Sequence, residues 1–217
     1  MIKTTLQGCE NYLKSQMLRL SNRDVTTTRE QHPFITISRQ AGAGGITVGR
    51  MLEAYLKEHD KKADCPWTLF DKELVKKVAE EHNIPEEFSE YMKEDKASEI
   101  QEILEEIFRL HPPDWVLAHK TSETILHLAE MGHVVLVGRG SNVVTRKLSG
   151  GFHVRLVGSY EKRLKHIQAY YGFSLKTSEE FIKKEDEGRK KYLKTYFGQN
   201  IDDPLLYDLV VNTDSIS

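Results

Sequence analysis

The sequence is poor in cysteine and contains no long apolar run. Its 217 residues include two cysteines, Cys9 and Cys65, which do not form a C-x-x-C pair. A disulfide framework and a cysteine zinc site are therefore not indicated, and we expect the reducing environment of the cytoplasm. No apolar stretch reaches the length of a membrane span, and the N-terminus lacks the uninterrupted apolar core of a signal peptide.

The sequence also lacks an excess of charge of either sign. It has 31 Lys and Arg residues against 33 Asp and Glu residues, a formal net charge of −2. A chain with this balance has no long-range field that would attract nucleic acid or an anionic membrane. We therefore expect neither as a partner, and an anionic ligand must be held by local groups. At 25.0 kDa the chain is long enough for one well-buried core.

What the chain does have is a glycine-rich turn between a predicted strand and a predicted helix. The β-branched run 34–38 predicts a buried strand, and apolar residues from Val48 to Leu56 recur at helical spacing. In such a turn, small residues let backbone N–H groups close around an anion, and the helix dipole attracts phosphate. The turn therefore predicts a phosphate-binding loop. Its candidate nucleotide contacts are Gly42, Ala43, Gly44, Gly45, Ile46 and Thr47.

This loop departs from the usual phosphate-loop pattern, G-x-x-x-x-G-K-[S/T]. Gly44 matches the second glycine, whereas Gly45 stands at the lysine and Arg39 at the first glycine. A dinucleotide fingerprint would need a third glycine at Thr47 and an acidic residue about 20 positions on, and neither is present. A purely structural turn, with glycines for close strand–helix packing, remains an alternative.

The rest of the chain alternates predicted strands with predicted helices. Strands are expected at 34–38, 67–70, 134–137, 152–157 and 207–212. Strands separated by helices indicate an α/β fold in which a five-stranded parallel sheet carries helices on both faces, a three-layer sandwich. The predicted helices lie at 3–20, 48–56, 99–110, 121–130, 161–166 and 178–196.

Residues 1–33 are predicted to form an appended helix and a linker, and residues 34–217 the main domain. Apolar residues from Leu6 to Leu20 fall roughly on one side of the helix, and a polar stretch follows. The favoured interpretation is a helix that packs on its own domain. The alternative is a partner contact, such as a homodimer formed through this helix or through the charged helical region at about 72–131.

Groups able to act on phosphate follow the ends of the predicted strands. The glycine loop follows the first strand, Asp71 the second and Gly138-Arg139-Gly140 the third. Ligands of open parallel sheets bind beyond the carboxyl ends of the strands, so we expect these segments to converge on one cleft. Phosphoryl transfer needs positive charge, an oriented acceptor and a metal ion. Arg39, Arg139 and Arg189 are the candidates for the charge, because a guanidinium fork binds two phosphate oxygens.

The candidate metal ligands are oxygen atoms rather than imidazoles. The nine histidines show no H-x-x-x-H spacing, so the sequence does not indicate a histidine metal site. Asp71 is a candidate magnesium ligand, acceptor contact or catalytic base. Its alternative role is the N-cap of the helix predicted to follow it.

Five motifs follow the first helix in order. They are Ile37-Ser38-Arg39-Gln40-Ala41-Gly42-Ala43-Gly44-Gly45, Phe70-Asp71-Lys72-Glu73-Leu74, Val137-Gly138-Arg139-Gly140, Lys184-Glu185-Asp186-Glu187-Gly188-Arg189 and Tyr207-Asp208-Leu209-Val210-Val211-Asn212-Thr213. Together they resemble the cytidylate kinase-like family of the P-loop nucleoside monophosphate kinases. The resemblance covers about residues 34–217. It implies a P-loop kinase-like fold with a helical acceptor-binding insert at about 72–131 and a lid at about 174–200.

The resemblance also implies roles for individual residues. The loop of these kinases often ends Gly-Ala-Gly-Lys-Gly-Thr, which makes Thr47 a candidate metal ligand beside Asp71. Gly140 stands where true cytidylate kinases have an acid after Gly-Arg, and Lys77 stands at an arginine of the acceptor helix. Arg163, on the predicted basic helix, is a further candidate nucleotide contact. The implied acceptor contacts are Asp71, Lys77, Arg139, Asp186 and Arg189.

Together these features predict Mg²⁺- and ATP-dependent phosphoryl transfer to a nucleoside monophosphate, with a cytidylate-type acceptor. Since Gly45 replaces the loop lysine, we hypothesise that Arg39 supplies the missing charge from the other end of the loop. The alternative function is a degenerate P-loop protein that binds a nucleotide and regulates a partner without kinase turnover.

Overall fold

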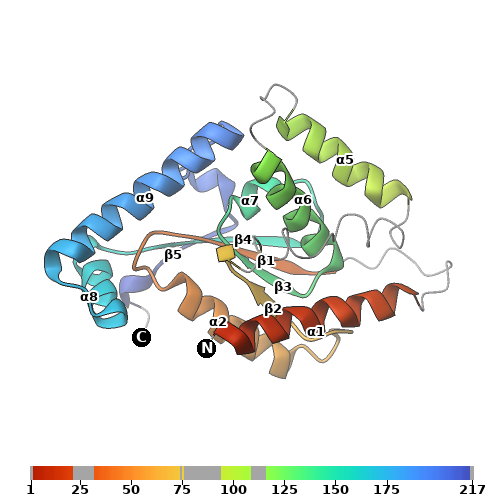
Figure 1. Cartoon of the computed structure of the whole chain (residues 1–217), viewed down its shortest axis with the longest axis horizontal. Coiled ribbons are helices and arrows are strands. Elements are labelled where there is room, and N and C mark those ends of the chain that lie inside the picture. The colour runs from red at the N-terminus through yellow and green to blue at the C-terminus, as the bar shows by residue number, and fades with distance from the viewer. Residues whose placement is uncertain (1, 22–31, 74, 76–93, 109–115, 216–217) are drawn as a thin grey trace.

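A five-stranded parallel sheet forms the centre of the protein (Figure 1). The computed structural model describes residues 2–21, 32–73, 75, 94–108 and 116–215. The strand order is β2-β3-β1-β4-β5, with parallel pairing throughout, which confirms the predicted α/β fold with five parallel strands. The strands are β1 Phe34–Arg39, β2 Thr68–Phe70, β3 Val134–Val137, β4 Gly151–Val157 and β5 Leu209–Asn212.

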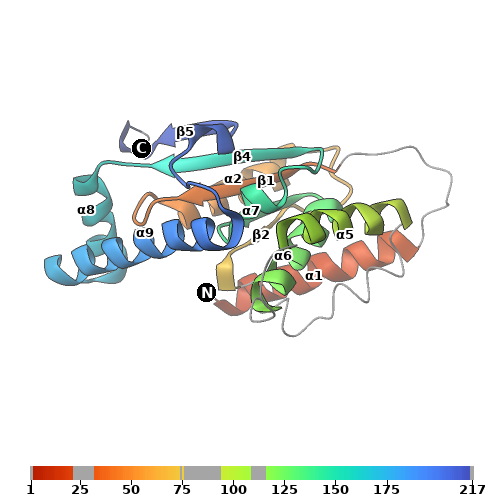
Figure 2. The ribbon, with the colours of Figure 1, turned by 90° about the horizontal axis from the view of Figure 1, so that it is seen from above.

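Each face of the sheet is covered by its own layer of helices (Figure 2). On one face, Ile37 and Val135 pack with Leu52 of α2. On the other face, Phe70 and Leu136 share a core with α1, α5 and α6. Side chains alternate between the two faces along each strand, so neighbouring residues of one strand enter different cores. The helices are α1 Ile2–Ser21, α2 Gly45–His59, α5 Glu94–Phe108, α6 Val116–Met131, α7 Ser141–Val144, α8 Tyr160–Tyr171 and α9 Leu175–Phe197.

The helices begin earlier than their apolar periodicity predicted. Helix α2 starts at Gly45 instead of Val48, because Gly44 adopts a φ of 76° and serves as the N-cap. Helices α5, α6 and α9 also begin before their predicted starts, since apolar periodicity detects the buried stripe of a helix and not its full length. Gly198 ends α9 in the left-handed conformation, as predicted. None of the described helices is both long and apolar enough to cross a membrane.

The first helix packs on the sheet of its own chain. Cys9, Tyr12 and Leu13 of α1 are buried in the main core. The Tyr12 ring meets the Phe70 ring edge-on at a centroid distance of 5.6 Å, and its hydroxyl donates a hydrogen bond to the Gly132 carbonyl. Burial raises the pKa of the Cys9 thiol to about 12, so this cysteine is a protonated packing residue. The helix therefore adopts the arrangement favoured from the sequence, and the homodimer contact stays a prediction.

His127 in α6 should make folding depend on pH. Its side chain is 5% exposed, and burial lowers its pKa from 6.5 to about 4. Between pH 6.5 and about pH 4 the unfolded chain binds a proton at His127 that the folded protein does not. The free energy of unfolding should therefore fall by about 1.4 kcal/mol for each unit by which the pH is lowered in this range. Urea unfolding at pH 7 and pH 5 measures this loss, and His127→Gln should lose about 2 kcal/mol less than the wild type. His59→Gln, at an exposed position, should follow the wild type. Equal losses in His127→Gln and the wild type would contradict the assignment.

Candidate active site

A cleft lies where the carboxyl ends of β1 and β3 meet one face of α9. Its volume is about 350 Å³, a size typical of small-molecule sites. Lys72, which follows Asp71, and the Gly138–Gly140 turn also line it, so the ends of β1, β2 and β3 meet at one cleft as expected from the sequence. Asp71 itself and the loop residues 42–47 are not among its lining residues. Its charged and aromatic lining residues are Arg39, Lys72, Arg139, Lys184, Glu185, Arg189 and Tyr192.

The glycine loop is held tightly against α8. At Gly42, where φ is 79°, an added Cβ would lie 2.5 Å from the carbonyl oxygen of Arg163, so only glycine fits. The N–H of Ala43 donates to the Gln40 carbonyl at 3.2 Å, and α2 begins directly after Gly44. The first N–H groups of a helix have no partner within it, so the start of α2 offers donors to an anion in the loop.

Arg163 and Asp186 brace the loop from outside. Arg163 is 8% exposed, and its Nη1 donates to the Ala41 carbonyl at 2.9 Å and to the Asp186 carboxylate at 2.7 Å. The other Asp186 oxygen accepts the N–H of Ala41 at 2.7 Å. Both residues were predicted to contact ligands, and in this structure both bind the loop instead. Their roles toward a nucleotide stay predictions.

Arg39 covers the loop position at which the usual lysine would stand. A Cβ at Gly45 would lie 2.7 Å from Cγ of Arg39, and a Cβ at Gly138 would lie 2.0 Å from its Nη1. The aliphatic part of Arg39 therefore crosses the first residue of α2, and its guanidinium lies against the turn after β3. Burial, followed by the charges of Arg189 and Arg139, lowers the pKa of Arg39 to about 10, so it remains cationic at neutral pH.

Arg139 is held in an unusual backbone conformation, and one nitrogen of its side chain is unsatisfied in the part of the chain that the structure describes. Its φ is 58°, and the glycines on both sides also have positive φ. Its guanidinium carbon lies 5.9 Å from the centroid of the Tyr192 ring. Within the described residues its buried Nε has no hydrogen-bond partner, which costs about 1–3 kcal/mol unless a ligand accepts the bond. Strain and an orphan donor together are typical of a binding group.

Gly140 leaves no room for an acidic side chain. A Cβ there would lie 2.7 Å from Cε2 of Phe197 and 3.2 Å from Cδ1 of Leu193. The end of α9 therefore fills the space in which true cytidylate kinases, by the resemblance above, would place their acid.

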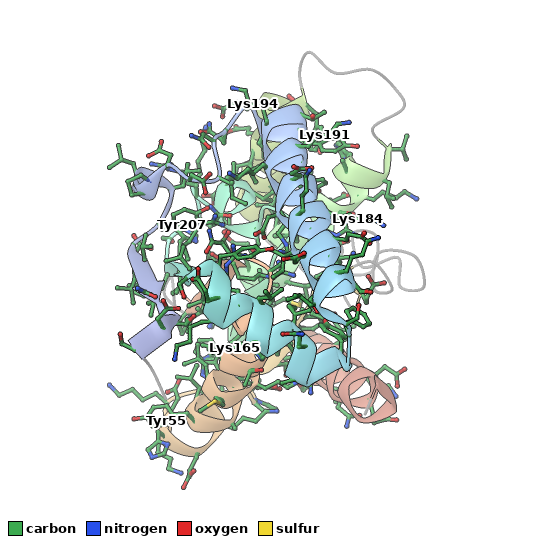
Figure 3. All side chains as sticks on the ribbon, turned by 90° about the vertical axis from the view of Figure 1, so that its left-hand side faces the viewer. Tyr55, Lys165, Lys184, Lys191, Lys194 and Tyr207 are labelled. Atoms are coloured by element: carbon green, nitrogen blue, oxygen red, sulfur yellow. The ribbon has the colours of Figure 1, made fainter. Side chains whose placement is uncertain are left out.

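Helix α9 contributes the remaining cationic groups. Arg189 donates to the Glu185 carboxylate at 2.7 Å and to the Asp186 carboxylate at 3.2 Å. It also lines a smaller cavity of about 160 Å³ between the loop and α9, next to Arg39 and Arg155. Figure 3 shows Lys184, Lys191 and Lys194 spaced along α9. The helix thus presents both signs of charge to the loop and the cleft.

The other predicted site residues have mixed placements. Thr47 is exposed on the first turn of α2 and lines neither cavity. The Asp71 carboxylate accepts the N–H of Glu73 at 3.0 Å, the geometry of an N-cap, and its charge also acts on Arg39. Lys77 lies outside the described residues. The assignments of Thr47 and Asp71 as metal ligands therefore stay predictions.

Several residues that line the cleft were missed from the sequence, among them Lys72, Asn142 and Tyr192. The signal for Tyr192 was available, because it follows Arg189 at i+3 and so shares its helical face. Lys72 adjoins Asp71 at a predicted strand end. Asn142 gives no sequence signal, because its place depends on how α7 packs.

The sequence model of the cytidylate kinase-like family matches residues 34–215. The chain belongs to the cytidylate kinase-like family. This membership confirms the resemblance and the P-loop kinase-like fold, and it indicates a nucleotide-related kinase. No curated protein matches this cytidylate kinase-like chain.

Solved structures that resemble this cytidylate kinase-like protein include the following two. An uncharacterized protein from Eubacterium ventriosum has 22% sequence identity and a TM-score of 0.60, with 84% of this chain and 89% of that chain covered. TT1252 from Thermus thermophilus has 13% identity and a TM-score of 0.45, with the same shares covered. At these identities the first likeness supports the fold alone.

The close contact between Gly45 and Arg39 can be tested by a double-mutant cycle. Gly45→Ala should lower the free energy of unfolding more when Arg39 is present than in an Arg39→Ala background, because the added Cβ meets the arginine stem. The coupling expected for such overpacking is about 1–3 kcal/mol in urea unfolding. Gly8→Ala, at a helical glycine with nothing within 4 Å, is the matched control and should show no coupling to Arg39. Additive effects of Gly45→Ala and Arg39→Ala would refute the packing.

Proposed function

We propose that this protein is a Mg²⁺- and ATP-dependent kinase that phosphorylates a nucleoside monophosphate, with a cytidylate-type acceptor. The position of Arg39 carries the proposal. Its stem crosses Gly45 and its guanidinium lies between the glycine loop and the turn of Arg139. A phosphate loop without lysine therefore still has a fixed cation at its mouth.

The chain's own groups can bind and stabilise a phosphoryl group in transfer. The N–H groups at the start of α2 and the positive end of its dipole bind the donor phosphates. Arg39, Arg139 and Arg189 line the cleft, where they can contact the phosphates of a donor and an acceptor. Because phosphoryl transfer is catalysed largely by positioning and charge, these fixed cations supply what the reaction requires.

Magnesium fits the donors that the chain offers near the loop. Thr47 and Asp71 present hydroxyl and carboxylate oxygens, the atoms that Mg²⁺ prefers, and the ion is usually held by one or two protein oxygens with phosphates and water. When bound, the ion supplies neutralisation of phosphate charge. Asp71 would then combine this role with capping the residues that follow it.

The acceptor is assigned to the cleft of about 350 Å³. Lys72 and Arg139 offer cations to its phosphate, while Tyr192 and Leu193 provide an apolar wall for its base. Since there is no room for an acidic side chain at position 140, neutral groups such as the buried Asn142 can read the base. The proposed enzyme therefore binds its acceptor differently from a true cytidylate kinase.

Helix α9 acts in this proposal as the lid. Its Asp186 bonds to the loop and to Arg163, so the helix and the loop are joined while the lid is closed. Closure keeps water away from the phosphates and so suppresses hydrolysis of ATP.

Moving the cation from position 39 to position 45 tests the proposal. Phosphoryl transfer is measured with labelled ATP, Mg²⁺ and CMP, dCMP, UMP, AMP or GMP as acceptor. Arg39→Ala should lower kcat about 10²- to 10³-fold, because a cation that stabilises the transition state is lost. Adding Gly45→Lys to Arg39→Ala should restore part of this loss, since the stem that blocks position 45 is gone.

The control for this series is Arg146→Ala, which removes an exposed arginine and should keep wild-type turnover. Arg139→Ala should abolish transfer to the preferred acceptor. Wild-type turnover in Arg39→Ala would remove the basis of the proposal, and no transfer to any acceptor with ATP still bound would favour the regulatory function described next.

One observation favours a second candidate function, a nucleotide-binding regulator without kinase turnover. The N–H of Ala41, part of the loop, is already bonded to the Asp186 carboxylate at 2.7 Å. An internal anion on the loop competes with phosphate, so nucleotide binding would release α9 and report on nucleotide concentration.

Asp186→Ala separates the two functions. In a regulator the variant should bind ATP more tightly without gaining turnover, because the competing carboxylate is gone. In a kinase it should lose turnover, because the lid no longer joins the loop. Isothermal titration with ATP and the transfer assay report the two effects. Glu187→Ala, an exposed neighbour on α9, is the control and should change neither. Unchanged affinity and turnover in Asp186→Ala would refute both roles for the contact.

A further inference from the structure

Two histidines and an aspartate lie close together at the amino-terminal ends of the strands, opposite the end that carries the glycine loop. His32 precedes β1, Asp64 lies before β2 and His133 precedes β3, so all three belong to the amino ends of neighbouring strands. One ligand atom from each lies within 4.8 Å of the other two. Nδ1 of His133 is 3.3 Å from Oδ1 of Asp64.

The backbone around this cluster is shaped to bring the two imidazoles together. His133 has a φ of 53°, a strained value for a residue with a side chain, and its N–H donates to the Pro33 carbonyl at 2.6 Å. At Gly132 an added Cβ would lie 2.0 Å from Cβ of His32, so the two chain segments touch only because this residue is glycine. Such strain is kept where the surrounding structure fixes a side chain in place.

Burial decreases across the cluster from one member to the next. His133 is 4% exposed, His32 is half-buried and Asp64 is exposed. Sγ of the buried Cys65 lies 3.4 Å from Nδ1 of His133. The cluster is therefore anchored in the protein on one side and open to water on the other, which leaves room for solvent ligands.

We propose that His32, Asp64 and His133 bind one divalent transition-metal ion of the zinc class. Two imidazoles and a carboxylate suit Zn²⁺, Co²⁺ or Ni²⁺, whereas Mg²⁺ and Ca²⁺ take oxygen ligands. Ligand atoms about 2.1 Å from a tetrahedral zinc lie roughly 3.4 Å apart, close to the separation of His133 and Asp64. Water completes the coordination on the exposed side.

The ion has a structural role, because it joins three segments that support α1. It ties the residue before β1 to the loops that lead into β2 and β3. The same loops hold α1, whose Tyr12 bonds to the Gly132 carbonyl and whose Gln16 bonds to Sγ of Cys65. The site is independent of the proposed kinase activity, whose phosphate loop lies at the carboxyl ends of the strands.

Metal binding by the full-length protein tests the proposal. After removal of metal with a chelator, titration calorimetry with Zn²⁺ should give one site per chain, and Co²⁺ should give the visible absorption of a site with nitrogen and oxygen ligands. His32→Ala and Asp64→Asn should each lower the Zn²⁺ affinity at least about tenfold. Zn²⁺ should raise the melting temperature of the wild type more than that of His32→Ala.

The variants are chosen at the less buried ligands, so that loss of folding does not imitate loss of metal. His59→Ala and Glu58→Gln, at exposed positions of α2, are matched controls and should keep the wild-type affinity. Millimolar Mg²⁺ should not displace Zn²⁺, which separates this site from the magnesium of the kinase. Absence of Zn²⁺ binding, or affinity that is unchanged in His32→Ala and Asp64→Asn, would overturn the proposal.

Discussion

The side chain of Arg39 takes the space in which a side chain at position 45 would otherwise lie. Its stem passes over Gly45 and its guanidinium fills the hollow at Gly138, so the loop, α2 and the turn after β3 are fitted around one residue. Protein interiors are close-packed, and two side chains cannot share this volume. The missing lysine and the two glycines are therefore parts of one packing arrangement rather than separate departures from a pattern.

A second arrangement joins the loop to α9. Asp186 accepts hydrogen bonds from Ala41, Arg163 and Arg189, so one carboxylate connects the loop, α8 and α9. Hydrogen bonds between charged groups are stronger than those between neutral groups, so this carboxylate holds the three elements firmly together. The expected contact of Arg163 with a nucleotide stays a prediction, and the arginines that line the cleft are Arg39, Arg139 and Arg189.

Much of the fold was predictable because each strand contains a short run of apolar and β-branched residues. The strand at 134–137 was predicted with its observed bounds, since a fully buried parallel strand gives an unbroken β-branched run. Strand ends also indicated where the cleft lies. What the sequence could not show was side-chain direction: the path of Arg39, the space at Gly140 and the bonds of Arg163 depend on packing. His32 and His133 are far apart in sequence, and only the parallel pairing of β1 with β3 brings them together.

The buried core includes residues that lie ahead of the region matched by the family model. The matched residues begin at Phe34, yet Cys9, Tyr12 and Leu13 of α1 fill part of the core beneath the sheet. The family model therefore covers residues 34–215, whereas the buried core also includes residues of α1. Without this helix the Phe70 side chain would lose the Tyr12 ring that covers it, so residues ahead of the family region contribute to the core of the domain that the family defines.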